Sequence, residues 1–123
     1  MTTVQRAAQI FGWIFILVGV VGLAYSYDMH EALLLGFFPV NVVHNAAHIL
    51  LGIWGIMAAK SFGGAKQYAT IAGILYIILA IVGWVEPNPG DMLPLGGNDV
   101  YLHAVLGVIL LGIGLTAKSR AGA

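Results

Sequence analysis

The chain has 123 residues, of which 60% are hydrophobic and 8% are charged, with five basic and five acidic side chains. This composition excludes an ordinary water-soluble domain, in which about 25% of residues are charged, and the absence of like-charge runs argues against a nucleic-acid partner. The chain has no cysteine, which excludes disulfides, thiolate metal sites and iron–sulfur clusters. We therefore expect one integral membrane domain over residues 1–123, with the lipid bilayer as its partner.

Four apolar runs are long enough to cross a ~30 Å hydrocarbon core as helices. They cover residues 7–25, 41–59, 68–85 and 99–117. Lys, Arg and Glu are absent from all four runs, and the single Asp, Asp99, is terminal. A charge at a helix centre would cost about 2.5–3.5 kcal/mol. The predicted fold is all-α, a four-helix transmembrane bundle.

The first run allows a second interpretation. Arg6 before it and the small residues of the "AYS" segment at its end resemble a secretory signal peptide. Because the run is longer than a usual signal core, we expect it to be a membrane helix instead.

The loops carry their own signals. Residues 32–38, "ALLLGFF", are apolar but too short to span, so we expect a lid lying in the membrane interface. The Pro- and Gly-rich residues 86–98 should be irregular, and the Gly-rich residues 61–66 should form a turn.

The charges divide between the two ends of such a bundle. The basic residues fall on the side of both termini and the middle loop: Arg6, Lys60, Lys66, Lys118 and Arg120. The acidic residues fall on the other side: Asp28, Glu31, Glu86, Asp91 and Asp99. The positive-inside rule then places both termini in the cytoplasm.

The two halves of the chain resemble each other. Ala8 and Gly12 in the first run align with Ala69 and Gly73 in the third. The second and fourth runs share "ILLGI", at residues 49–53 and 109–113. Because these matches follow the same order in both halves, they predict two tandem helical hairpins related by a pseudo-two-fold axis along the membrane normal. In that alignment His103 is the approximate counterpart of His44.

Three histidines lie on polar stripes at helical spacing. On the second run the stripe contains Asn41, His44, Asn45 and His48, and on the fourth it contains Asp99 and His103. The opposite faces are aliphatic and suit lipid. We therefore expect an inward-facing histidine cluster near the outer face of the membrane.

The chemistry of this cluster stays open at this point. Neutral imidazoles could simply hydrogen-bond across helices. His44, His48 and His103 could hold a divalent metal, with Asp99 or Glu31 completing the ligand set. A haem b could sit between His103 and either His44 or His48. A proton relay or quinone chemistry is the remaining alternative.

Other polar residues give weaker signals. Tyr76, in the middle of the third run, is predicted to be a packing residue whose hydroxyl finds a partner. Ser61 and Ser119 lie at the inner side and the histidines at the outer side, so no nucleophilic triad is expected.

The pattern Asn41-x-x-His44 leads into "HILLGIWGIMA", and the last run reads "NDVYLHAVLGVILLGIGL". Together they resemble the small four-helix bacterial membrane proteins grouped as domain of unknown function 4383, over residues 9–118. His44, Asp99 and His103 are the most family-like positions. The resemblance implies a multi-pass protein of the bacterial cytoplasmic (inner) membrane and supplies no activity.

From these observations we expect a non-enzymatic accessory or structural membrane component, acting as a homo-oligomer or within a larger membrane complex. The alternative is a haem b or divalent-metal protein in electron transfer or metal handling. A transporter is disfavoured, because four short helices leave little room for a path.

Overall fold

The computed structural model describes residues 1–119, so the predicted basic residue Arg120 lies outside the described part. In this part four α-helices form an all-α bundle: α1 (Thr3–Tyr25), α2 (Val42–Ala58), α3 (Phe62–Val85) and α4 (Asn98–Leu115). A two-stranded hairpin, β1 (Ala32–Leu34) and β2 (Phe38–Val40), and a short 3-10 helix, η1 (Pro89–Asp91), fill the connections. The predicted four-helix fold is confirmed.

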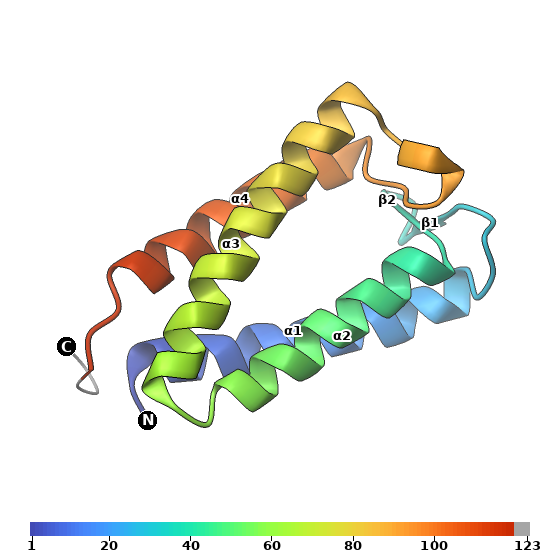
Figure 1. Cartoon of the computed structure of the whole chain (residues 1–123). Helices are drawn as coiled ribbons and strands as arrows, with labels where there is room; N and C mark the ends of the chain where they lie inside the picture. Colours follow the sequence, from blue (N-terminus) through green and yellow to red (C-terminus); the bar gives the residue numbers. More distant parts are fainter. Residues whose placement is uncertain (120–123) are drawn as a thin grey trace.

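The helices are arranged in two pairs. α1 runs along α2, and α3 runs along α4 (Figure 1). The N-terminus, the α2–α3 turn and the end of α4 lie at one end of the molecule, and the β-hairpin and η1 lie at the other (Figure 1). The two ends therefore correspond to the basic and acidic groups of charges.

α1 and α3 begin earlier in the chain than the apolar runs predicted, because side chains cap their N-termini. Thr2 and Gln5 form a capping box at the start of α1. Ser61 caps α3 by accepting a hydrogen bond from the backbone N–H of Gly64 at 3.0 Å. The predicted turn at residues 61–66 is therefore wrong, because this cap holds the glycines in the first helical turn.

The second helix is shorter than predicted. Asn41 is its extended N-cap, and its side chain accepts a hydrogen bond from the His44 backbone N–H at 2.9 Å. α2 then has 17 residues, and α4 ends at Leu115 rather than near residue 117. α1, α3 and α4 are long and apolar enough to cross a membrane, whereas α2 is a shorter apolar helix.

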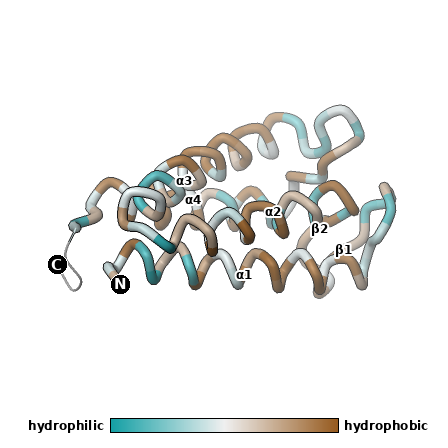
Figure 2. Tube along the Cα trace, turned by 60° about the horizontal axis from the view of Figure 1, so that its bottom comes forward, coloured by the Kyte–Doolittle hydropathy of each residue, from teal (hydrophilic) through white to brown (hydrophobic). Residues whose placement is uncertain are grey.

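The outer surfaces of the helices are apolar. Hydrophobic residues dominate the helices, and hydrophilic residues gather toward their ends and in the loops (Figure 2). Large side chains are exposed along them, including Trp13, Leu17, Leu50, Ile81 and Val108. Such a surface suits lipid, so the fold is that of a membrane protein.

Within each pair the helix backbones touch at glycines. A methyl group at Gly12 would lie 2.7 Å from the Gly52 carbonyl oxygen. A methyl group at Gly107 would lie 2.9 Å from the Gly73 carbonyl oxygen. Both crossings therefore depend on small residues, as in many membrane helix pairs.

Residues 32–40 form an antiparallel hairpin with Leu34 opposite Phe38. Leu35 and Gly36 both have positive φ values, 55° and 79°, which make the tight turn. Leu34 and Val40 are buried against the helices, whereas Leu35 is exposed. The expected lid is thus a β-hairpin, and its buried side chains reach the polar cluster described next.

Candidate functional site

The structure brings His44, His48 and His103 together inside the bundle. One ring nitrogen of each lies within 4.8 Å of those of the other two, and all three residues are buried. His44 and His48, one turn apart on α2, have stacked rings 4.6 Å apart. The His103 ring, from α4, lies 6.0 Å from that of His44 and 6.4 Å from that of His48. The cluster therefore bridges the two helix pairs.

One ring nitrogen of each imidazole lacks a hydrogen-bond partner in the described part of the chain. The Nδ1 atoms of His44, His48 and His103 are buried, and none has a partner among residues 1–119. Buried polar atoms are normally paired, because leaving one unpaired costs about 1–3 kcal/mol. Three such atoms in one small region distinguish this cluster from an ordinary apolar helix contact.

A cavity of ≈ 30 Å³ lies at this cluster. It is lined by the three histidines and by Ala47, Leu51, Tyr76, Leu79, Leu93 and Leu95. This volume holds an ion with a small ligand, since one water needs about 10–15 Å³. Sites for large organic ligands measure about 300 Å³ or more. The cavity therefore has room for a single ion or water and is far smaller than a site for haem.

The two carboxylates named as further ligands lie in different places. Asp99 is buried, and its Oδ2 lies 3.6 Å from the Nδ1 of His44. Glu31 is exposed and lines a separate hollow near Phe37 and Asn98. Asp99 is thus beside the cluster, and Glu31 is not part of it.

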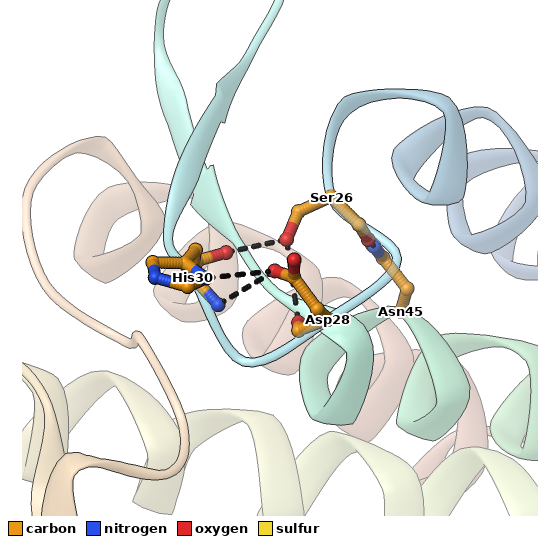
Figure 3. Close-up of polar contacts among 4 residues, drawn as sticks. All are labelled: Ser26, Asp28, His30 and Asn45. Atoms are coloured by element: carbon orange, nitrogen blue, oxygen red, sulfur yellow. Dashed lines mark hydrogen bonds and ion pairs between the residues drawn. The ribbon is translucent and has the colours of Figure 1, made fainter.

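The fourth histidine, His30, lies outside the cluster with its side chain 92% exposed. It belongs to a small network that fastens the loop after α1 (Figure 3). The Asp28 carboxylate accepts from the His30 backbone N–H at 2.8 Å, and the Ser26 hydroxyl donates to the His30 carbonyl. The buried Asn45 amide donates to the Ser26 carbonyl at 2.9 Å, which ties this loop to α2.

A second hollow of ≈ 150 Å³ adjoins the cluster beneath the β-hairpin. Its lining joins apolar residues of the hairpin with three polar residues of the site, namely His44, His48 and Asp99. Leu34, Phe38 and Val40 are the hairpin residues that face it. A small molecule in this hollow would therefore contact the imidazoles directly.

Comparison with known proteins adds one finding to this geometry. The profile of a family described as "Domain of unknown function (DUF4383)" matches residues 5–116. The chain belongs to the DUF4383 family. No curated protein and no solved structure matches this DUF4383 chain. The resemblance drawn from the histidine pattern is confirmed.

Tyr76 is the site residue that sequence reasoning missed in this DUF4383 protein. It lines the same cavity, and its buried hydroxyl has no partner among the described residues, contrary to the prediction. A signal was present, because a Tyr inside a run of Ile and Leu carries a polar atom that lipid cannot satisfy.

Proposed function

We propose that this membrane protein binds a divalent metal ion through His44, His48 and His103. The observation that carries the proposal is that one ring nitrogen from each of three buried histidines lies within 4.8 Å of the others, beside a small cavity. Neutral imidazole is a preferred ligand of Zn²⁺ and of similar transition metals.

The spacing requires little adjustment. Three nitrogens within 4.8 Å of one another lie at most about 2.8 Å from a common central point, compared with about 2.0–2.1 Å in a zinc–imidazole bond. Each nitrogen must therefore move by less than about 1 Å, which small ring rotations provide.

The absence of partners separates this proposal from a purely structural role. Imidazoles that only join helices should donate or accept hydrogen bonds across them. The Nδ1 atoms here have none within residues 1–119. Joining helices therefore does not account for these buried imidazoles, which favours a ligand shared by the three rings.

The test is metal uptake by the purified protein, carrying an affinity tag without histidine. We expect about one Zn²⁺ or Co²⁺ per chain by mass spectrometry of the metals, and Co²⁺ should give visible ligand-field absorption. His103→Gln keeps a polar side chain but removes a ligand, so affinity should fall at least tenfold.

His30→Gln is the matched control, because His30 is exposed and outside the cluster. It should bind Co²⁺ as the wild type does. A wild-type protein that binds no more Co²⁺ than His103→Gln would overturn the proposal. In that case the histidines serve packing alone, and the variant should only lower thermal stability.

We further propose that the protein lies in the bacterial cytoplasmic membrane, with α2 as the fourth span and both termini in the cytoplasm. The grouping of Arg6, Lys60 and Lys66 toward one end of the bundle supports this orientation. At about 26 Å, α2 is near the lower limit for a span.

A tandem duplication of the helix pair is also proposed. One constant shift in numbering relates Gln5 and Gly12 to Lys66 and Gly73, and another relates Gly52 and Ala59 to Gly107 and Gly114. Equivalent contacts support it: the Gln5 amide donates to the Ala59 carbonyl, and the Lys66 ammonium donates to the Gly114 carbonyl.

The shift that relates Gly52 to Gly107 also makes His103 the counterpart of His48. The alignment of the shared "ILLGI" segments had instead paired His103 approximately with His44. The same shift also relates His44 to Asp99. These two side chains face each other, with His44 Nδ1 3.6 Å from Asp99 Oδ2. The proposed metal site would then lie on the pseudo-two-fold axis.

A further inference from the structure

We infer that the metal keeps an open fourth position, and that the Tyr76 hydroxyl donates a hydrogen bond to the small ligand bound there. The ligand class is a water, hydroxide or small anion with an oxygen or nitrogen donor. This inference rests on the proposed metal site and adds a residue from α3 to it.

The first support is the environment of Tyr76. Its side chain is 1% exposed, and its hydroxyl is buried without a partner in the described chain. Its ring lies 5.2 Å from that of His103 and 5.3 Å from that of Phe15. These rings fix the tyrosine beside the cavity that it shares with the three histidines.

The second support is that, within residues 1–119, the cavity lining offers no fourth ligand besides the three histidines and Tyr76. The remaining cavity lining is Ala47 and the leucines Leu51, Leu79, Leu93 and Leu95. Asp99 Oδ2 lies 3.6 Å from His44 Nδ1, and Asp99 lines the neighbouring hollow beneath the β-hairpin rather than this cavity. Three histidines with one free position are the arrangement in which zinc binds an exchangeable ligand, whereas structural zinc sites are closed by four protein ligands.

The third support is that the buried Tyr76 hydroxyl needs a hydrogen-bond acceptor. Inside an apolar cavity the Tyr76 hydroxyl is a donor without an acceptor. A metal-bound water or anion presents an acceptor lone pair at that place. One small ligand would therefore satisfy both the metal and the hydroxyl, and ≈ 30 Å³ leaves no room for a large one.

An access route also exists. His44 and His48 line the ≈ 150 Å³ hollow beneath the β-hairpin as well as the smaller cavity. Because the two spaces share these histidines, we expect a three-atom anion in the hollow to reach them. Azide is therefore a suitable probe of the open position.

The experiment titrates the Co²⁺-loaded protein with azide and follows the visible absorption of the metal. We expect azide to change the spectrum of the wild type. Tyr76→Phe keeps the ring packing and removes the hydroxyl. Compared at full Co²⁺ loading, this variant should bind azide about three- to tenfold more weakly than the wild type, the effect of one hydrogen bond.

Tyr68→Phe is the matched control. Tyr68 also has a buried hydroxyl without a partner among residues 1–119, but it packs against Trp54 and lines neither hollow. Its azide affinity should equal that of the wild type.

The outcomes are distinguishable. A cobalt spectrum that azide leaves unchanged would overturn the open position, and equal azide affinities of Tyr76→Phe and Tyr68→Phe would overturn the role of Tyr76. A wild-type protein that takes up no Co²⁺ would end the metal proposal, and this inference with it.

Discussion

Asp99 is a buried carboxylate beside the histidine cluster, and its Oδ2 lies 3.6 Å from His44 Nδ1. A carboxylate in this place orients a metal-binding imidazole through the ring nitrogen that does not bind the metal, and the loss of such a partner typically lowers metal affinity 10- to 100-fold. We therefore expect Asp99→Asn to lower Co²⁺ affinity within about that range, as measured by competition with a chelating dye. Asp28→Asn, at an exposed carboxylate beside His30, should leave the affinity unchanged. Equal affinities for the two variants would contradict a supporting role for Asp99.

Asn45 is a residue whose role is structural. Its amide is buried and donates to the Ser26 carbonyl at 2.9 Å (Figure 3). Asn45→Ala removes this bond inside the apolar region, so unfolding should become easier by about 0.6–1.7 kcal/mol. Detergent-induced unfolding measures the change. Asn98→Ala removes an exposed bond to the Phe37 carbonyl and should have a smaller effect. A larger loss for Asn98→Ala would refute this assignment.

At the scale of elements, the glycine crossings decide how closely paired helices approach. A methyl group at Gly12 would meet the Gly52 carbonyl oxygen and the Ile56 backbone nitrogen, at 2.7 and 2.9 Å. Backbone atoms cannot turn aside, so Gly12→Ala should destabilise the protein by about 1–3 kcal/mol. Gly112→Ala is the control, because nothing lies within 4 Å of its added methyl. Thermal unfolding in detergent compares them, and equal midpoints would contradict the close crossing.

The elements also show what periodicity can and cannot predict. The 3.6-residue stripes correctly predicted a buried face for His44, His48 and His103, because polar side chains avoid lipid. Periodicity could not place Tyr76 in the cavity. The position of Tyr76 along α3 relative to His103 on α4 depends on where these two helices cross. The hairpin at residues 32–40 was missed because three-residue strands are too short to show alternation.

At the scale of the whole molecule, the separation of charge predicts how the chain sits in a membrane. Lys60 and Asp91 are both exposed and lie in connections at opposite ends of the bundle. The chain has no cysteine, so single-cysteine variants carry one label each. In intact cells an impermeant thiol reagent should label Asp91→Cys, and it should label Lys60→Cys only after lysis. The reverse pattern would invert the proposed orientation.

The glycine crossings have a mechanical consequence. Within each pair, α1 with α2 and α3 with α4, backbones touch, so each pair should move as one stiff body. Between the pairs, contact at the site is made by rings such as Phe15 with Tyr76 and His48 with His103, 5.3 and 6.4 Å apart. Ring contacts hold less tightly than touching backbones, so we expect any movement to occur between the pairs rather than within them. His44 and His48 come from α2 and His103 from α4, so an ion bound by all three would join the two pairs at this junction.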